Sequence, residues 1–353
     1  MNIVTLNVNH PLWSATLKQL PHDVYHLPDY VALDAKRTKT VPEAFLLQEG
    51  EKIFFAPYLL RNCADIDECG AQTYDVISPY GYPGILMSQA AIANPEFPDF
   101  ALQKFCHTLR EKGACSAFLR LHPILSENFA KVFQSNPLVE NGKTVSIDLS
   151  LDEGQIWAKT RRGHQSTINK CKRLGFTAAI VPFAEYIDEF ISIYEETMDR
   201  VKAKDSYYFS RDYFAGLLKL NHKVHLGIVK QEEQIICVCL FFESCSIVQA
   251  HLGGTKTEFL KQSPFNLLLH HARLWAKARG NRYLHIGGGV GGKKDNLYTF
   301  KSGFSKKRHD FYTLRSIVNQ SRYYDLLQLR AKKINKSVEE LQQSQFFPAY
   351  RAS

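Results

Sequence analysis

The alternation of apolar and polar residues predicts two strand hairpins of similar length, far apart in the chain. AFLLQEGEKIFFAPYLLR (44–61) and VHLGIVKQEEQIICVCLFFES (224–244) each hold two apolar runs separated by a short polar segment. Apolar runs of strand length on both sides of such a segment are typical of hairpins. A further strand is expected after each hairpin: a run that ends in SPYGYPG (78–84), and SIVQAHLGG (246–254).

The same order of elements continues in both parts. Apolar residues at helical spacing predict a helix over 98–112, and Ser263 followed by Pro264 predicts the N-cap and first turn of a helix that ends at Gly280. CSAFLRLHP (115–123) and YLHIGGG (283–289) are the strands that close the two parts. The order hairpin, strand, helix, strand recurs after about 170 residues, which indicates an internal duplication.

Helical sequence opens the second part. Ser150 and Glu153 form the pattern of a capping box, which predicts a basic helix that runs to Gly175. A second helix is expected over 184–202, and Ser210 is expected to cap a short third helix before the hairpin.

The elements together predict an α/β (α+β) fold of tandem duplicated domains with mixed central sheets. The chain has 353 residues, a length that favours two domains. We place the domains at 1–147 and 148–318, and we expect the helical segment 319–353 to pack back on the first domain.

The amino-acid composition limits the binding partners and the cellular compartment that we expect. Lys and Arg outnumber Asp and Glu by 44 to 35, which gives a net charge of +9 and favours anionic partners such as nucleotides or nucleic acid. The eight cysteines form no C-x-x-C pair, so neither a disulfide framework nor a metal site is expected. The sequence contains no signal peptide and no membrane-spanning apolar run, which predicts a cytoplasmic protein without stable membrane insertion. It does not determine the oligomeric state.

Three segments carry residues that core packing does not require. In SPYGYPG (78–84), the glycines and prolines exclude a regular element, while Tyr80 and Tyr82 offer rigid rings with a hydroxyl each. This segment is either a binding loop or a structural turn with exposed aromatics.

The second segment is HIGGGVGGKKDNLYTFKSGF (285–304). Backbone N–H groups of a loop as rich in glycine as this one can approach phosphate or carboxylate oxygens, although the spacing is not that of a P-loop. Farther along, Lys301 lies between Phe300 and Phe304, so its ammonium group either extends to solvent or is held in a cleft.

The third segment, YEETMDRVKAKDSYYFS (194–210), places Arg200 at a helix end, followed by Tyr207. The planar guanidinium group suits phosphate or carboxylate, although such a charged run is more often a solvated face. The basic helix 157–173 has the same two interpretations: it faces a polyanion, or it is solvated.

Taken in order, several of these segments resemble the Fem-type aminoacyltransferases and their GNAT-like relatives in bacterial polysaccharide and peptidoglycan pathways. The resemblance rests on DVYHLPDY (23–30), SPYGYPG (78–84), the Thr-Met-x-Arg helix end at 197–200 and LHIGGG…DNLYTFKSGF (284–304). The last is the most specific motif, because an acidic residue, here Asp295, a Leu and an F-K-x-x-F ending recur there in that family.

The resemblance implies a pair of GNAT-like domains with a catalytic cleft along the second. Family members of the cross-bridge type transfer an aminoacyl group from aminoacyl-tRNA to an amine of a cell-wall precursor. Lys301 with Phe300 then lies where the family stabilises the reacting ester carbonyl. Residues implied in substrate binding are Arg200, Tyr207, Tyr80, Tyr82, Lys36, Arg37, Gly288, Gly289 and Asp295.

Three interpretations of the activity follow from the sequence. An aminoacyl ester is already activated, so transfer from aminoacyl-tRNA to a nucleotide- or lipid-linked precursor requires no cofactor. The long coiled-coil arm of some cross-bridge enzymes has no counterpart here, which leaves an acyl-CoA donor as the alternative. TKTEFLKQSPF (255–265), however, lacks the glycines of a CoA pyrophosphate loop, so we rank tRNA above CoA. A non-catalytic protein that binds RNA or anions on a GNAT scaffold is the third interpretation.

Overall fold

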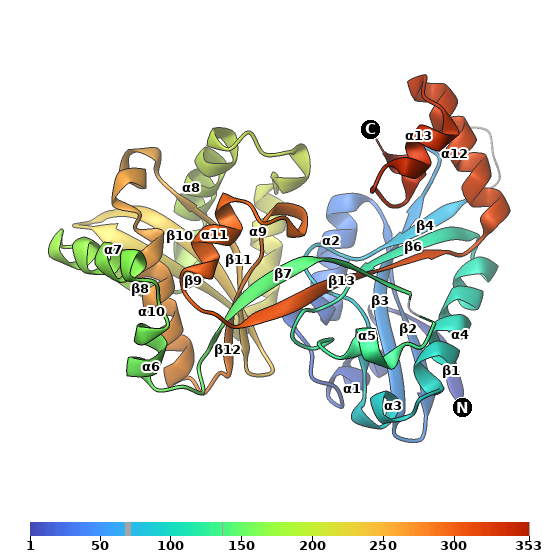
Figure 1. Cartoon of the computed structure of the whole chain (residues 1–353), viewed down its shortest axis with the longest axis horizontal. Helices are drawn as coiled ribbons and strands as arrows, with labels where there is room; N and C mark the ends of the chain where they lie inside the picture. Colours follow the sequence, from blue (N-terminus) through green and yellow to red (C-terminus); the bar gives the residue numbers. More distant parts are fainter. Residues whose placement is uncertain (68–71, 136, 353) are drawn as a thin grey trace. The chain divides into compact units, whose positions relative to one another are not determined.

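The computed structural model describes residues 1–67, 72–135 and 137–352, and it divides the chain into two compact units. Unit 1 comprises Met1–Asn141 and Phe311–Ser353, and unit 2 comprises Gly142–Asp310 (Figure 1). The chain passes from one unit to the other within β7 (Leu138–Asp148) and again within β13 (Arg308–Ile317).

Unit 1 is built on a mixed sheet with the strand order β1-β2-β3-β4-β6-β13, in which only β4 and β6 are parallel. Its other strands are β1 (Asn2–Asn7), β2 (Val41–Glu49), β3 (Lys52–Asn62), β4 (Tyr74–Ile77), β5 (Leu86–Met87), which pairs with β3, and β6 (Ala114–Arg120). Its helices are α1 (Pro11–Leu17), η1 (Val24–His26), α2 (Pro28–Thr38), α3 (Gln89–Ala93), α4 (Phe97–Glu111), α5 (Phe129–Val132), α12 (Gln320–Ile334), α13 (Val338–Gln343) and η7 (Ala349–Arg351).

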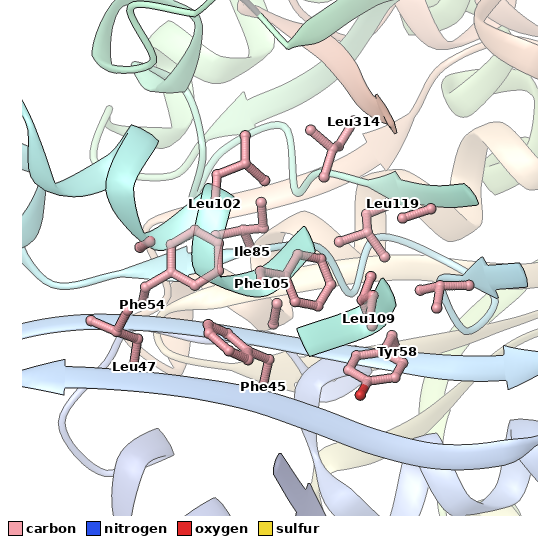
Figure 2. Packing of buried hydrophobic residues seen from close by; sticks show 14 of the residues in the cluster. Phe45, Leu47, Phe54, Tyr58, Ile85, Leu102, Phe105, Leu109, Leu119 and Leu314 are labelled. Atoms are coloured by element: carbon pink, nitrogen blue, oxygen red, sulfur yellow. The ribbon is translucent and has the colours of Figure 1, made fainter. Parts of the chain in front are cut away.

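The hairpin β2–β3 buries side chains on both of its faces. On β2, Phe45 packs with Phe105 of α4, while its neighbour Ala44 belongs to the cluster around Trp13 of α1. Successive side chains of a strand point to opposite faces, so this alternation covers one face with α4 and the other with α1 and α2. Figure 2 shows Phe45, Phe54 and Phe105 gathered in the core on the α4 side.

Unit 2 repeats this plan with the strand order β7-β12-β11-β10-β9-β8, in which only β11 and β12 are parallel. Its other strands are β8 (Thr177–Val181), β9 (Val224–Gln231), β10 (Gln234–Ser244), β11 (Ile247–Thr255) and β12 (Tyr283–Gly287). Its helices are α6 (Glu153–Ala158), α7 (Arg162–Arg173), η2 (Phe183–Glu185), α8 (Ile187–Arg200), η3 (Asp205–Tyr207), α9 (Arg211–Leu217), η4 (Leu218–Lys223), η5 (Thr257–Gln262), α10 (Phe265–Ala278), η6 (Val290–Gly292) and α11 (Asn296–Ser302). The expected duplication of a mixed α/β domain is confirmed.

Two adjacent glycines of β11 let a helix approach each face of the unit 2 sheet closely. A Cβ at Gly254 would lie 2.6 Å from the carbonyl oxygen of Ile193 on α8, and one at Gly253 would lie 2.9 Å from the ring of Phe265 on α10. Neighbouring strand residues face opposite sides, so α8 covers one face of β11 and α10 covers the other.

Several expected helix ends are wrong in detail. The capping box before α6 is formed by Asp152 with Gln155, because Ser150 instead donates its hydroxyl hydrogen bond to Asp148. The expected basic helix is two helices, α6 and α7, with a break at 159–161. Pro264 is the N-cap of α10, while Ser263 adopts a left-handed conformation with φ +53°.

The C-terminal segment packs within unit 1. The Tyr350 hydroxyl lies 2.7 Å from Ser116 Oγ on β6 and 3.3 Å from the Asp75 carboxylate on β4. Arg351 donates a 2.6 Å hydrogen bond to the same carboxylate. In the part of the chain that the structure describes, no helix has the length and apolar character needed to cross a bilayer.

Candidate functional site

The parallel strands β11 and β12 of unit 2 separate after a short pairing. Only 247–249 of β11 and 283–285 of β12 are paired with each other. Beyond that point β11 continues to Thr255 along β10, whereas Gly287 of β12 pairs with β7. The carboxyl ends of both strands are therefore unpaired with each other at the same edge of the sheet, which is where open α/β sheets bind ligands.

A buried polar pair lies at the point where the two strands stop pairing. Gln249 and His285 are the last paired residues, and their side chains hydrogen-bond to each other through Gln249 Oε1 and His285 Nδ1. Gln249 Nε2 also donates a hydrogen bond of 2.9 Å to its neighbour's carbonyl at Ala250. The sequence analysis did not single out this pair, although two polar residues in otherwise apolar strands were a signal that could have found it.

Asp295 organises the glycine-rich loop between β12 and α11. Its carboxylate accepts hydrogen bonds from the backbone N–H groups of Tyr298, at 2.8 Å, and Val290, at 2.9 Å. Partial burial opposes its ionisation, but these two hydrogen bonds prevail and lower its pKa. A Cβ at Gly289 would lie 2.4 Å from the carboxylate, and one at Gly288 would lie 2.8 Å from the carbonyl of Lys143. Both glycines therefore permit close packing of the loop.

Lys301 extends from α11 to the carboxyl end of β12. Its Nζ donates a hydrogen bond of 2.8 Å to the carbonyl of Gly288, directly after the strand. Burial lowers the pKa of this ammonium group to about 8, although the charge of the Asp295 carboxylate acts in the opposite direction. An ammonium group has three N–H donors. The Gly288 carbonyl is its hydrogen-bond partner among the described residues, so two donors are available to a ligand.

Phe300 is positioned by a histidine that the sequence analysis did not select as a site residue. His164 of α7 donates a hydrogen bond of 2.8 Å from Nε2 to the carbonyl of Phe300. The His164 ring also contacts the rings of Phe300 and Phe304, with centroids 5.3 and 4.7 Å away. The spacing of His164 with Ile168 and Cys171, all buried on one face of α7, was the available signal.

Arg200 of α8 lies at the carboxyl end of β11, and Tyr207 contacts the same helix. Arg200 donates hydrogen bonds of 3.0 Å to the Thr255 carbonyl and to Thr257 Oγ1, and it also contacts Thr197 Oγ1 at 3.3 Å. These bonds fix the end of α8 to the end of the strand. The Tyr207 carbonyl accepts a hydrogen bond of 2.7 Å from the hydroxyl of Tyr194 on the same helix.

The remaining expected site residues belong to unit 1, where Asp34 connects Tyr80 with Arg37. Its carboxylate accepts hydrogen bonds from the backbone N–H of Tyr80, at 2.9 Å, and from Arg37 Nε, at 2.7 Å. Lys36, on the same helix, is exposed, and the ring of Tyr82 packs against that of Phe311.

The loop 78–84 follows β4, the strand of unit 1 that corresponds to β11. Arg120 donates hydrogen bonds to the carbonyls of Ser78 and Pro79, at 3.3 and 2.7 Å. Gly81 has φ +96° and lies so close to Tyr25 that a Cβ would be 2.3 Å from its ring. The chain itself therefore packs tightly beside the carboxyl end of β4, whereas unit 2 has the glycine-rich loop and Lys301 beside its corresponding strands.

The expected site residues thus form three groups. Asp295, Phe300, Lys301, Gly288 and Gly289 lie together at the end of β12. Arg200, on α8 at the end of β11, and Tyr207, which contacts α8, lie in the same unit, and Tyr80, Tyr82, Lys36 and Arg37 are in unit 1. No group of three or more metal-binding side chains occurs among residues 1–67, 72–135 and 137–352.

Known proteins share this arrangement of strands and helices. Residues 158–302 match the family described as acetyltransferase (GNAT) domain. The structure is similar to that of FemX, with a TM-score of 0.69 and 11% sequence identity over 92% of this chain and 99% of that chain. No curated protein matches at the level of sequence.

Two further solved structures share the architecture. One is the tandem GNAT protein from the clavulanic acid biosynthesis pathway, with a TM-score of 0.50, 10% identity and coverage of 89% and 98% of the two chains. The other is the C-terminal domain of a putative lysylphosphatidylglycerol synthetase from Agrobacterium fabrum, with a TM-score of 0.54, 14% identity and coverage of 83% and 87%. Residues 158–302 therefore match a GNAT domain, and the whole chain shares the fold of FemX and of the tandem GNAT protein.

Proposed function

We propose that this chain is an acyltransferase that moves an aminoacyl group from aminoacyl-tRNA to an amine of a cell-wall or polysaccharide precursor. The proposal rests on the position of Lys301. Its side chain is partly buried at the carboxyl end of β12, and two N–H donors of its ammonium group have no partner among the described residues. Acyl transfer builds negative charge on the carbonyl oxygen, and a fixed cation in a water-poor site stabilises that charge.

The reaction needs little beyond this charge and correct orientation. The amine nitrogen of the acceptor attacks the ester carbonyl carbon, a C–N bond forms, and the C–O bond to the ribose breaks. The proton of the amine passes to the leaving oxygen, directly or through a substrate hydroxyl. Lys301 keeps its own proton and donates a hydrogen bond to the carbonyl oxygen, while Phe300 supports the adjacent end of α11.

The segment before α10 favours tRNA over CoA as the donor. A CoA pyrophosphate would need free backbone N–H groups there. The N–H of Thr257 instead donates to the Glu196 carboxylate at 2.7 Å, and that of Ser263 donates to the Leu260 carbonyl at 3.1 Å. The Glu196 carboxylate also adds negative charge where a pyrophosphate would bind, which disfavours that ligand.

For the acceptor, we propose a nucleotide- or lipid-linked precursor whose phosphates are bound by cationic residues. Arg200 and Tyr207 of unit 2 are the residues that we propose for this contact. A guanidinium group fixed by backbone and threonine oxygens, as in Arg200, is pre-organised for a phosphate. Because aminoacyl-tRNA is a cytoplasmic donor, we place the reaction in the cytoplasm.

A second candidate is an acyl-CoA-dependent N-acetyltransferase that acts on an amino sugar or another small molecule. The match of residues 158–302 to a GNAT acetyltransferase domain favours it. A third is a protein that binds RNA or other anions without catalysis, which the basic helix α7 favours.

Donor binding separates the three candidates. The purified chain is titrated with charged tRNA and, separately, with acetyl-CoA at several salt concentrations, and transfer to amines is followed with a labelled aminoacyl group. Salt-sensitive tRNA binding, absence of CoA binding and amine-dependent transfer are expected. CoA binding without tRNA binding would overturn the proposal in favour of the acetyltransferase. Binding of tRNA without transfer to any wall-precursor amine would leave the non-catalytic protein.

A further inference from the structure

Unit 2 contains a pocket that the proposed acyl transfer does not use. It has a volume of about 180 Å³ and lies between α6, β7 and the segment that follows α11. Its lining combines an apolar wall with charged side chains at the rim: Ile147, Leu151, Ile156 and Phe304 with Lys159, Lys306, Lys307 and Asp148, and Ser305.

The pocket is separate from the Lys301 site. Its residues Ile147 and Asp148 pair with Leu284 and Tyr283, at the start of β12. Lys301 bonds to Gly288, beyond the end of that strand. Four to five strand residues at about 3.3 Å each separate the pairing residues of the pocket from Gly288 by roughly 15 Å along the strand. The Lys301 ammonium group is therefore directed away from the pocket, although the N–H of Phe304 in the lining donates to the Lys301 carbonyl at 3.1 Å. A ligand in this pocket is therefore not the reacting acyl group.

The lysines provide positive charge that the protein itself does not neutralise by direct pairing. Lys159, Lys306 and Lys307 are all exposed, and within the described ranges none of their ammonium groups lies within ion-pair distance of a carboxylate. With Asp148 included, the lining carries three positive charges and one negative charge. Lysine clusters of this kind are suited to phosphate oxygens.

Asp148 adds an acceptor beside these cations. Both hydrogen bonds from Ser150, at 3.0 Å from its N–H and 2.6 Å from its hydroxyl, go to the same carboxylate oxygen, Oδ1. Among the described residues, Oδ2 has no hydrogen-bond donor in contact with it. A carboxylate oxygen next to lysines suits a hydroxyl group on a molecule that also carries a phosphate.

The backbone around the pocket is fixed by side chains from neighbouring elements. Lys277 of α10 donates hydrogen bonds to the carbonyls of Leu149 and Leu151, at 2.9 and 2.8 Å. The N–H of Arg161 donates to the Gly303 carbonyl at 2.7 Å, directly before Phe304. A lining held in this way is already formed before a ligand arrives, which lowers the entropic cost of binding.

We propose that this pocket binds a phosphorylated sugar group, of the kind found at the end of a nucleotide. The phosphate contacts Lys306, Lys307 and Lys159, a sugar hydroxyl donates to Asp148, and a ring packs on the apolar wall. Pockets that bind drug-sized ligands have volumes of about 300–1,000 Å³, so a pocket of about 180 Å³ accepts a single-ring group and leaves the rest of a larger molecule outside.

The test uses equilibrium binding to the full chain of cytidine 5′-monophosphate, ribose 5-phosphate, inorganic phosphate and cytidine. Both sugar phosphates are expected to bind at least tenfold more tightly than phosphate or cytidine. Tighter binding of the nucleotide than of ribose 5-phosphate would identify a nucleotide end as the source, and equal affinity would identify a sugar phosphate. Affinity of inorganic phosphate equal to that of both sugar phosphates would overturn the proposal, because the lysines would then be a diffuse anion site.

Variants that remove equal charge inside and outside the pocket test whether the sugar phosphate binds there. The double substitution Lys306→Ala with Lys307→Ala is expected to weaken sugar phosphate binding at least tenfold. The control, Lys170→Ala with Arg173→Ala, removes the same charge from the exposed face of α7. It is expected to change the affinity for sugar phosphate less than twofold. Asp148→Asn should reduce the preference for ribose 5-phosphate over phosphate. Equal losses in the two double variants would also overturn the proposal.

Binding here is independent of acyl transfer, and one variant separates the two. Lys301→Ala is expected to bind the sugar phosphate with unchanged affinity, because its side chain lies at the other end of β12. If Lys301→Ala loses binding together with turnover, the ligand occupies the acyl-transfer site and the separate pocket is excluded.

Discussion

His164 Nε2 donates a hydrogen bond of 2.8 Å to the backbone carbonyl of Phe300. A carbonyl only accepts, so the imidazole carries its hydrogen on Nε2, and Nδ1 is left to accept from Arg161, whose Nη2 lies 3.3 Å away. Burial lowers the pKa of His164, which keeps this ring neutral. One side chain of α7 thus fixes the turn of α11 that carries Lys301.

Replacing His164 by Phe tests this positioning role. His164→Phe keeps an aromatic ring against Phe300 and Phe304 but removes the hydrogen bond. A displacement of Lys301 of about 1 Å would lower kcat roughly 10- to 100-fold while the KM for the donor changes little. Steady-state kinetics measures both constants. An unchanged kcat in a folded variant would show that packing alone holds α11 in place.

The close approach of Gly303 to His164 gives a second test. A Cβ at Gly303 would lie 2.4 Å from His164 Nε2, whereas one at Gly163 would meet nothing within 4 Å. Gly303→Ala should therefore lower the thermal unfolding midpoint and kcat together. Gly163→Ala, within the first turn of α7, should leave kcat unchanged and stabilise the protein slightly, by up to about 1 kcal/mol. Equal behaviour of the two variants would contradict the contact.

Removal of the Lys301 ammonium should have a large effect on turnover. Lys301→Ala is expected to lower kcat by about 100-fold or more, because the charge on the carbonyl oxygen loses its stabilising group. Lys301→Arg should recover part of the activity by restoring the cation. A labelled-donor assay compares the two at saturating donor. Full activity in the alanine variant, with unchanged unfolding in urea, would exclude Lys301 from the reaction.

The pH dependence of turnover follows from the state of the same group. Burial lowers the pKa of Lys301 to about 8, so the ammonium is protonated below that pH and loses its charge above it. A role in charge stabilisation therefore predicts a kcat that falls as the pH rises through about 8. Lys301→Arg should keep its lower activity constant across this range, because a guanidinium stays charged. A decline in both proteins would point to another group.

Stability should depend on pH through His26. Its side chain is fully buried, and burial, followed by the charge of His122, lowers its pKa to about 3. The unfolded chain takes up this proton near pH 6.5 and the folded chain does not, so stability is complete above that value and decreases as the pH falls.

At pH 5 the loss due to His26 amounts to about 2 kcal/mol. Urea unfolding measures the free energy of unfolding at pH 7 and at pH 5. The decrease between the two pH values should be smaller by that amount in His26→Gln than in the unsubstituted protein, whatever the stability of the variant at pH 7. His107→Gln, a change of an exposed histidine, should leave the difference as in the unsubstituted protein. An identical pH dependence in all three proteins would contradict the role of His26.

The strands and the duplication could be predicted because local pattern determines them. The hairpins at 44–61 and 224–244 are runs of apolar residues that only a doubly covered strand can bury, and β2–β3 and β9–β10 are found there. Helix ends were less predictable, because neighbouring residues such as Ser and Asp can each serve as the N-cap of the same helix. Asp152 took the role assigned to Ser150, since the Ser150 hydroxyl found a closer partner in Asp148.

The candidate site depended on contacts between residues far apart in sequence. The resemblance to the Fem-type motif selected Lys301 and Asp295, which lie on one segment of the chain. It did not reveal that His164, more than a hundred residues earlier, holds Phe300, or that Arg200 reaches the Thr255 carbonyl. Such partners are set by how helices pack on the sheet, and a single sequence carries no direct record of that packing.

The path of β7 and β13 has a consequence for dissecting this protein. β13, translated last among the strands, pairs with β6 of unit 1 through Thr313–Ile317, whereas β7, which follows β6 along the chain, pairs with β12 of unit 2. A gene fragment that stops at residue 141 would therefore lack the strand that covers β6 and would expose its edge. During synthesis, the sheet of unit 1 is completed only after the ribosome has finished unit 2, so residues 1–141 alone do not form a complete unit 1.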